Sequence, residues 1–371
     1  MNKEGFEFDL ETRRFLINRW ETELGKKVQK EIIEGLQNSV EIRAILDDYV
    51  LEHSENADPY GHPIYPKNAM KENSFWVLTQ DDLRGIRIFN TDLSSTPSLE
   101  KKALSYSWFY RCNLTSANIE QSDMSFATFE KCNLENAILA YSGGFDVILK
   151  ECNLKRACLY NSWFIDSEFY DSDLSGVMFE NAKFSNIKVN YKTKFDIKLR
   201  NLYDERALPP DQKPDLLRSI RVAYENIELW PERDAFLFEE KTAQRKYLLW
   251  TELKQSINIK NLLLWGYSYF SSLLSGYSTK PLRVIWSSLV IIILFSVLFF
   301  YMNFRYSYKS LTNSIIGAMG YSFSNFTGKT SLLGWEVQKS SLTEIIALSE
   351  HIFGIVMISL FVVVLAKKLI R

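Results

Sequence analysis

The sequence predicts a mixed fold in which a polar repeat domain is followed by two apolar membrane helices. Three observations lead to this fold class. An apolar residue recurs at every fifth position over residues 104–189, similar tripeptides recur at every twentieth position, and two long apolar segments lie near the C-terminus. An amphipathic helix repeats at about 3.6 residues and a strand at about 2, so a sustained period of five indicates a repeat architecture.

The apolar series has one exception, Gly144, and a small residue stands two positions before most members. The series is Leu104, Phe109, Leu114, Ile119, Met124, Phe129, Leu134, Leu139, Gly144, Leu149, Leu154, Leu159, Phe164, Phe169, Leu174, Phe179, Phe184 and Val189. Gly143 and Gly144 predict a gap where a core side chain belongs. We interpret this gap as a tolerated packing defect, with a binding notch as the alternative.

A second, longer period lies on top of the first. The tripeptides that show it start at every twentieth position and are Cys112-Asn113-Leu114, Cys132-Asn133-Leu134, Cys152-Asn153-Leu154 and Ser172-Asp173-Leu174. Four five-residue units therefore make one coil, and equivalent residues of successive coils stack at about 4.8 Å. The three asparagines of these tripeptides are expected to form a ladder.

Upstream of residue 104 the pattern is shifted. Leu83, Ile88 and Leu93 are in phase with one another but offset by one residue from the main series. We interpret residues 94–98 as a loop that absorbs this slip.

The five-residue units resemble those of the pentapeptide-repeat family, whose unit is A(D/N)LXX. The resemblance implies a right-handed, four-sided β-helix over residues 76–190, with about five coils and a length of about 25 Å. Some members of the family are DNA mimics. Residues 104–189 hold eleven acidic and seven basic residues, a balance too mild for a duplex mimic, so no nucleic-acid partner is expected.

Helical patterns flank the repeats. Residues 1–75 are predicted to form a helical module that caps the open end of the β-helix, with a sensor or partner site as the alternative. Residues 191–256 are predicted to form a helical hairpin linker, with one helix over 215–229 and a second over 232–255 that has Pro231 at its start. Leucines and aromatics among serines at 257–280 predict an interfacial helix, with a buried helix of the soluble domain as the alternative.

Two segments are long enough to cross a bilayer. Residues 284–304 carry no formal charge, and residues 345–366 carry only Glu350 and His351. A hydrocarbon core of about 30 Å needs about 20 helical residues. Basic residues before the first segment and after the second predict a two-span protein of the inner membrane with both termini in the cytoplasm.

The order of these parts resembles bacterial pentapeptide-repeat proteins that end in a two-helix, potassium-channel-like pore module. The junction that carries this likeness is Gly276, Tyr277, Pro281 and Arg283. The resemblance implies a pore domain over 281–371, a pore loop at about 310–336 and a homotetramer. It also implies that Gly354 lies near a gating bend and Glu350 near the outer mouth of the pore.

The predicted pore loop departs from that family. Residues 311–322 suit a short pore helix, and the filter region that follows is Ser324, Asn325, Phe326, Thr327, Gly328 and Lys329. The family has T-x-G-Y-G or a near variant followed by Asp, but this chain lacks the glycine pair that aims carbonyl groups at an ion. Lys329 also places a positive charge on the path. The sequence therefore predicts a pore architecture with a degenerate filter, which disfavours potassium selectivity.

Catalytic and metal-binding patterns are not found in the sequence. The four cysteines, Cys112, Cys132, Cys152 and Cys158, all lie in the repeats and are interpreted as core packing. His53, His62 and His351 are scattered, and the formal net charge is -1 with no long charge run. We expect no cofactor, no metal and no enzymatic activity.

The function predicted from the sequence is an oligomeric ion channel or channel-like pore. Its partners would be lipid, inorganic ions, other copies of the chain and an unidentified cytoplasmic protein or ligand that the repeat domain senses. Glu350 and His351 are expected to face an aqueous path or each other, or to reach water at the outer interface. The alternative function is a membrane-anchored scaffold or signalling protein without conductance.

Overall fold

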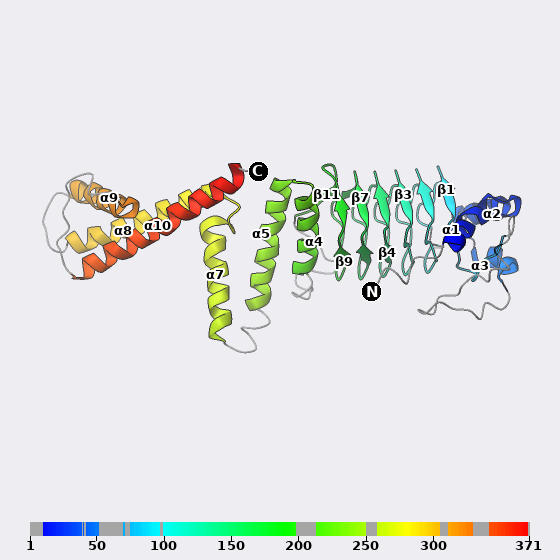
Figure 1. Cartoon of the computed structure of the whole chain (residues 1–371), viewed down its shortest axis with the longest axis horizontal. Helices are drawn as coiled ribbons and strands as arrows, with labels where there is room; N and C mark the ends of the chain where they lie inside the picture. Colours follow the sequence, from blue (N-terminus) through cyan, green and yellow to red (C-terminus); the bar gives the residue numbers. More distant parts are fainter. Residues whose placement is uncertain are drawn as a thin grey trace. The chain divides into compact units, whose positions relative to one another are not determined.

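The computed structural model describes residues 10–38, 40, 42–51, 70, 75–96, 99–197, 213–249, 258–304, 311–328 and 341–369. The chain divides into two compact units, Met1–Glu240 and Lys241–Arg371. The first unit holds the repeats with helices at both ends, and the second holds long apolar helices (Figure 1). The boundary between the units, after Glu240, lies within the helix α5 (Trp230–Tyr247). The hairpin linker is predicted to end later, at residue 256. The predicted domain bounds remain predictions.

The repeats form a β-solenoid of about five turns built from short parallel strands. One sheet contains β1 (Arg87–Phe89), β2 (Trp108–Tyr110), β3 (Thr128–Glu130), β5 (Ile148–Lys150), β7 (Glu168–Tyr170) and β10 (Lys188–Val189). A second sheet contains β4 (Gly143–Phe145), β6 (Trp163–Ile165) and β9 (Lys183–Ser185). A third contains β8 (Asp173–Leu174) and β11 (Lys194–Phe195). Strand partners such as Phe109 and Phe129 stand four five-residue units apart in the sequence, which confirms the predicted coil.

The predicted core series fills the solenoid. Phe109 and Phe129 are fully buried or nearly so, and their rings stack with centroids 4.9 Å apart and planes 2° apart. Asn113, Asn133 and Asn153 pair in register, as the ladder requires, and Asn153 Nδ2 donates to Asn133 Oδ1 at 2.9 Å. The side-chain bond does not continue to Asn113, because Asn133 Nδ2 donates to Thr115 Oγ1 at 2.7 Å.

The corners of the coils carry an unexpected backbone conformation. The residue two positions after most core residues has a positive φ, as in Arg111 (53°), Lys131 (56°) and Glu151 (53°). Such a conformation costs a residue with a side chain about 1–2 kcal/mol. Hydrogen bonds between coils hold it, since Arg111 N donates to Glu130 O at 2.9 Å and Lys131 N donates to Lys150 O at 2.8 Å.

The predicted slip near the start of the solenoid is confirmed by the strand register. Ile88 pairs with Phe109, one position further along the sequence than a regular coil would place its partner. Leu99 is fully buried and stands five positions before Leu104, so it belongs to the main series. The extra residue therefore lies between Leu93 and Leu99, an interval that includes residues 97–98 outside the described ranges.

The prediction of a gap at Gly143 and Gly144 is wrong. A Cβ atom on Gly144 would lie 2.4 Å from the backbone nitrogen of Ser125, and one on Gly143 would lie 1.8 Å from the carbonyl oxygen of Trp163. The two glycines let the backbone of β4 come close to the neighbouring coils. The backbone itself occupies the space that a side chain fills elsewhere, so neither a packing defect nor a notch is present.

Gly144→Ala tests this correction. We expect the variant to lower the free energy of unfolding by about 1–3 kcal/mol, because the added methyl group overpacks a filled site. Chemical denaturation of the full chain in detergent, followed by circular dichroism at strand wavelengths, measures the change. A stabilised variant would mean that the methyl group had entered an empty space.

Helices cover the first coil of the solenoid (Figure 1). They are α1 (Leu10–Asn18), η2 (Arg19–Glu21), α2 (Glu23–Gln37), α3 (Ile42–Leu46) and η3 (Asp47–Tyr49). Arg19 Nη1 donates to the carbonyl oxygen of Trp76 at 2.6 Å, and Arg19 Nη2 and Trp20 Nε1 donate to that of Arg84 at 2.9 and 2.8 Å. Carbonyl groups at the open edge thus find donors, as the capping interpretation expects.

A buried charge cluster fixes this cap. Asp82 Oδ1 lies 3.1 Å from Arg19 Nη2 and 2.8 Å from Arg84 Nε, and all three side chains are at least nine-tenths buried. Burial by itself would raise the pKa of Asp82, but the two guanidinium groups outweigh burial and hold the pKa well below its usual value. Asp82 is therefore ionised in the folded chain.

Asp82→Asn is expected to lower the free energy of unfolding by about 3–5 kcal/mol, because it leaves two buried guanidinium groups without their carboxylate. Hydrogen exchange of the amides in α1 and the first coil, measured by mass spectrometry, will show the loss as faster exchange at that end. Asp92→Asn is the matched control, since Asp92 is an exposed aspartate of the same coil.

The comparison of the natural chain with Asp82→Asn also predicts how the contribution of Asp82 to stability depends on pH. Because the folded-state pKa of Asp82 is lowered, its contribution to stability is present above its unfolded pKa of about 3.9 and is lost as the pH falls through the folded value. The stability difference between the natural chain and Asp82→Asn should be constant from neutral pH to about pH 5 and shrink below about pH 4. A difference that grows on acidification would contradict the assignment.

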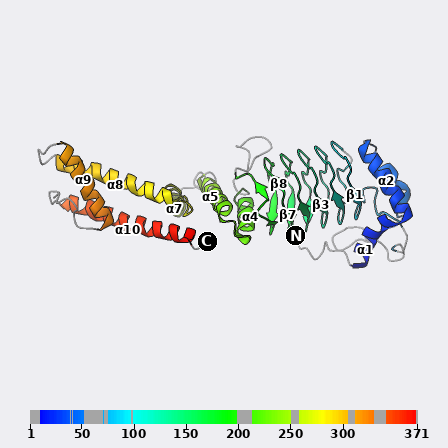
Figure 2. The ribbon, with the colours of Figure 1, turned by 90° about the horizontal axis from the view of Figure 1, so that it is seen from above.

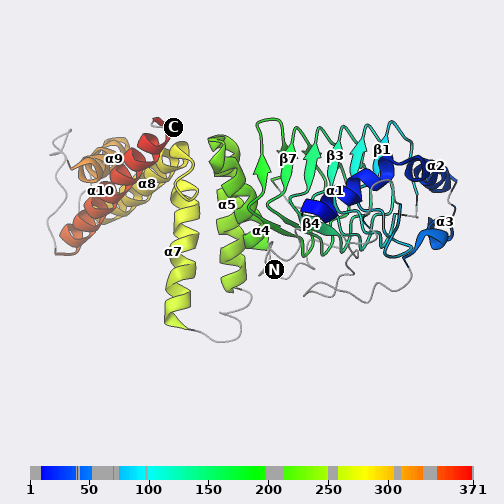
Figure 3. The same ribbon diagram turned by 45° about the vertical axis from the view of Figure 1, so that its right-hand side comes forward.

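A helix closes the other end of the solenoid, beside the last coils (Figure 3). In α4 (Lys213–Asn226), Ser219 Oγ donates to the carbonyl oxygen of Phe184 at 2.6 Å and Tyr224 Oη to that of Thr193 at 2.9 Å. The next helix, α5 (Trp230–Tyr247), is joined to α4 by Glu240, whose carboxylate pairs with Arg218 and Arg221. The start of α5 agrees with the prediction, while residues 250–257 lie outside the described residues.

Candidate functional site

The second unit begins with the last residues of α5 and contains four further described helices: α7 (Ile259–Ser275), α8 (Pro281–Phe304), α9 (Leu311–Thr327) and α10 (Ser341–Leu369). Two of them, over Pro281–Met302 and Leu342–Leu369, are long and apolar enough to cross a membrane, and most of their residues are not buried within the chain. The shorter α9 packs against both α8 and α10 (Figure 2).

The C-terminal end of α9 lies against the middle of both long helices. Ser322 Oγ donates to the carbonyl oxygen of Ile292 at 2.9 Å, and Ile292 is the twelfth of the 24 residues of α8. A Cβ atom on Gly354, the fourteenth of the 29 residues of α10, would lie 1.9 Å from the carbonyl oxygen of Phe326. The absence of a side chain at Gly354 therefore allows α9 to approach α10.

A cluster of polar groups is buried at this place, and we take it as the candidate site. Glu350 is fully buried, and its Oε1 shares the single hydroxyl proton of Ser322 with the carbonyl oxygen of Ile292. The Nδ1 of His351 lies 2.9 Å from the carbonyl oxygen of Asn325. Within the part of the chain that the structure describes, Glu350 Oε2 and Asn325 Nδ2 are buried without a hydrogen-bond partner. Such groups are costly to bury, so their presence points to a function.

The predicted filter residues lie beside this cluster but are mostly helical. Residues 324–327 form the last turn of α9, so their carbonyl groups follow the helix and do not form an extended row. Gly328 has a φ of 72° and ends the helix, with its N–H donating to the carbonyl oxygen of Asn325 at 3.2 Å. Lys329 lies outside the described residues.

The two residues that the pore resemblance placed in the second span both lie at the contact with α9, and their roles in a pore remain predictions. The helix α10 is continuous, and a Cβ atom on Gly354 would meet the backbone of Phe326. Glu350 is buried against Ser322, so within a single chain it does not reach water. Sequence reasoning could not place either residue, because their surroundings come from α9, a separate helix that precedes α10 in the chain.

The predicted junction forms a tight turn between α7 and α8. Gly276 ends α7 with a φ of 58°, Pro281 is the first residue of α8, and Arg283 Nη1 donates to the carbonyl oxygen of Ser272 at 3.2 Å. Tyr277 also has a positive φ of 58°. Most large apolar side chains of α7 are exposed in the described chain, and both interpretations of this helix, interfacial or buried, remain predictions.

A further surface feature lies on the solenoid and was missed by sequence reasoning. Phe89, Trp108 and Tyr110 form an aromatic cluster with ring centroids 5.3–6.4 Å apart. Arg111 and Lys131 lie over the Tyr110 ring at 5.1 and 5.8 Å. The available signal was the presence of aromatics next to the core positions Ile88 and Phe109 in two adjacent coils, which the register brings together.

Cys112, Cys132 and Cys152 occupy equivalent positions in successive coils, and each bonds to a backbone carbonyl oxygen as Ser172 does in the next coil. The Sγ atoms of Cys112, Cys132 and Cys152 lie 3.2–3.4 Å from carbonyl oxygens one coil back, and Ser172 Oγ makes the equivalent bond at 2.9 Å. Burial raises the pKa of the Cys158 thiol. Protonated thiols are poor nucleophiles and metal ligands, which supports the packing interpretation. The described residues contain no cluster of three metal-binding side chains.

Comparison with known families identifies the solenoid. The model of the family "Pentapeptide repeats" matches in eight copies, over residues 104–140 and 148–187. This part of the chain is a pentapeptide-repeat domain. The matched residues end before α4, so this match does not bear on the second unit.

Several solved structures resemble the pentapeptide-repeat domain. A pentapeptide repeat protein, Rfr23, from the cyanobacterium Cyanothece is 22% identical, with 31% of this chain and 88% of that chain covered and a TM-score of 0.17. One from the Arabidopsis thaliana thylakoid lumen is 18% identical (38% and 72% covered, TM-score 0.20). The full-length plasmid-mediated fluoroquinolone resistance protein QnrB1 is 15% identical (33% and 78% covered, TM-score 0.19).

These likenesses add nothing to what the strand pairing of the pentapeptide-repeat domain already shows. None of the curated proteins compared with the chain matches it.

Gly354→Ala tests the contact between α9 and α10. The added methyl group would meet backbone, so we expect it to lower the free energy of unfolding of the second unit by about 1–3 kcal/mol. Thermal unfolding of the full chain in detergent, followed by tryptophan fluorescence, measures the change. Gly266→Ala is the control because a Cβ there meets nothing within 4 Å and alanine favours a helix. Equal effects of the two variants would refute the contact.

Proposed function

We propose that the chain is a membrane protein in which several copies of α8, α9 and α10 form a pore attached to a pentapeptide-repeat domain. The observation that carries the proposal is the end of α9 against the middle of both long helices. A crossing helix needs about 20 residues. A 17-residue helix that ends halfway along two crossing helices would enter the bilayer and stop inside it.

A helix that ends inside a bilayer is tolerated only where its end is covered by protein or faces water. The polar cluster around Glu350 supplies such a covering. A simple anchor would need no ionisable group at this depth, since ionisable groups in membrane helices are expensive and usually serve ion or proton pathways. The cluster therefore favours a pore over an anchor.

The proposed pore is oligomeric, because two crossing helices cannot enclose a water-filled path. Apolar side chains on α8 and α10 remain exposed in the single chain, where lipid or other copies would cover them. By the resemblance to two-helix channel modules the assembly would be a tetramer with both termini in the cytoplasm. We propose weak ion selectivity rather than potassium selectivity, since residues 324–327 are helical and Lys329 follows them.

A second candidate function is a membrane-anchored scaffold. The aromatic cluster of Phe89, Trp108 and Tyr110 favours it, because exposed aromatic side chains are enriched where proteins bind one another. In the pore proposal the same surface would be the place where the pentapeptide-repeat domain receives a signal.

Conductance of the purified full chain in planar lipid bilayers tests the pore. We expect currents, and we expect Glu350→Gln to change the open probability by about tenfold, because the amide places N–H donors where Glu350 has oxygen atoms and an unsatisfied buried donor costs about 1–3 kcal/mol. Glu344→Gln is the matched control, since Glu344 is an exposed glutamate of the same helix. Its effect should stay within about twofold.

A monomeric or dimeric particle in detergent together with no current would refute the pore and leave the scaffold. Reversal potentials in mixed potassium, sodium and chloride would measure selectivity. A strong preference for potassium would contradict the weak selectivity proposed here.

A further inference from the structure

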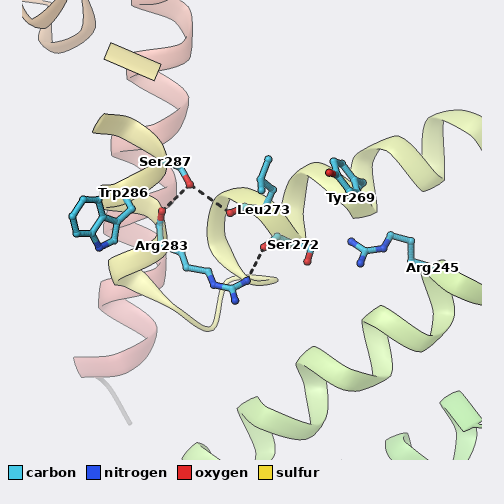
Figure 4. A pocket seen from close by; sticks show the side chains of 7 residues that line it. All are labelled: Arg245, Tyr269, Ser272, Leu273, Arg283, Trp286 and Ser287. Carbon is cyan, nitrogen blue, oxygen red and sulfur yellow. Dashed lines mark hydrogen bonds between the residues drawn. The ribbon is translucent and has the colours of Figure 1, made fainter. Parts of the chain in front are cut away.

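A cavity of about 350 Å³ lies beside the junction of α7 and α8 (Figure 4). Its walls come from three helices. The last turns of α7 supply Tyr269, Ser272 and Leu273, and α5 supplies Arg245. The first turns of α8 supply Arg283, Trp286 and Ser287. The volume lies within the range of small-ligand sites, which are about 300–1,000 Å³.

The tight turn at Gly276 builds this cavity. It brings the end of α7 against the start of α8, and Arg283 Nη1 holds the two together through the carbonyl oxygen of Ser272. Ser287 Oγ donates to the carbonyl oxygen of Arg283 at 2.7 Å and lies 3.3 Å from that of Leu274. The wall is therefore fixed by hydrogen bonds in the described structure.

The described lining of the cavity is positively charged. Two of the seven described residues that line it are arginines, and none of these seven is acidic. The guanidinium carbon of Arg245 lies 5.5 Å from the centre of the Tyr269 ring, which orients this side chain. Arginine binds phosphate through paired hydrogen bonds in a fixed geometry. The chemistry of the site is thus that of a phosphate group.

The rim of the cavity is apolar and aromatic. Trp286 is 68% exposed and Leu273 is 57% exposed. Trp and Tyr gather at the level of lipid headgroups, where one edge of the ring is wet and the rest is apolar. Arg283 and Trp286 lie in the first two turns of a helix able to cross a membrane, so the cavity would lie at this level.

We infer that this cavity binds the phosphate group of an anionic phospholipid, with the acyl chains lying along Trp286 and Leu273. The inference rests on the proposed membrane insertion of α8 and α10 and is independent of conduction. Free phosphate shares the chemistry of the headgroup but cannot use the apolar rim, so phospholipid is the ligand that fits both parts of the site.

Native mass spectrometry of the full chain in detergent tests the inference by titration with phosphatidylglycerol, phosphatidylcholine and inorganic phosphate. We expect saturable binding of phosphatidylglycerol, and an apparent Kd raised by about tenfold or more in Arg245→Gln, because charge-assisted hydrogen bonds are lost. Lys246→Gln removes the same charge from the adjacent, exposed position outside the cavity and should change the Kd by less than about twofold.

Arg245→Lys keeps the charge without the planar guanidinium group and should give a Kd between those of the natural chain and Arg245→Gln. Equal effects of Arg245→Gln and Lys246→Gln would overturn the inference, as would equal binding of phosphatidylcholine and phosphatidylglycerol. Binding of inorganic phosphate without binding of lipid would also overturn it.

Flotation of the full chain with phosphatidylcholine vesicles after alkaline extraction separates the two proposals. A chain that does not float refutes membrane insertion itself. A chain that floats but whose phosphatidylglycerol binding is insensitive to Arg245→Gln refutes only the lipid site.

Discussion

Hydrogen bonding between successive coils is the constraint on which the pentapeptide-repeat domain depends. Each coil is a short loop of chain that cannot bury its own apolar residues, and it is stable only because the coils before and after it pair with its backbone. This arrangement leaves two open ends. The ion cluster of Arg19, Asp82 and Arg84 lies at the first end. The hydroxyl groups of Ser219 and Tyr224 bond to backbone carbonyl groups at the other end. The caps therefore supply bonding partners where no neighbouring coil is present.

The features that follow from repetition could be predicted from the sequence, and those that depend on a close approach could not. The core positions, the register of the asparagines and the slip before residue 99 all follow from counting in fives. The five-residue period predicts a gap at Gly144 because the sequence shows only that a side chain is missing there. It does not show that the backbone of Ser125 lies close enough to exclude a side chain at Gly144. The positive φ at residues such as Arg111 was missed for a related reason, since coil pairing overrides local preference there.

The second unit shows the same division between pattern and contact. The two long apolar helices and the helical start of the predicted pore loop were evident from composition. The roles of Glu350 and Gly354 depend on what packs against them, and that partner is α9. A glycine within an apolar helix predicts a bend or a close contact equally well. Only the position of the Phe326 carbonyl group distinguishes the two in this chain.

The cluster around Glu350 differs in kind from the buried charges of the solenoid. Asp82 has two guanidinium partners and accepts hydrogen bonds from backbone as well, so its environment stabilises one arrangement. Glu350 uses one carboxylate oxygen, while its other oxygen and the amide nitrogen of Asn325 are buried without partners in the described structure. The cluster around Glu350 is therefore less completely hydrogen-bonded than the cluster around Asp82, and burying such groups costs free energy.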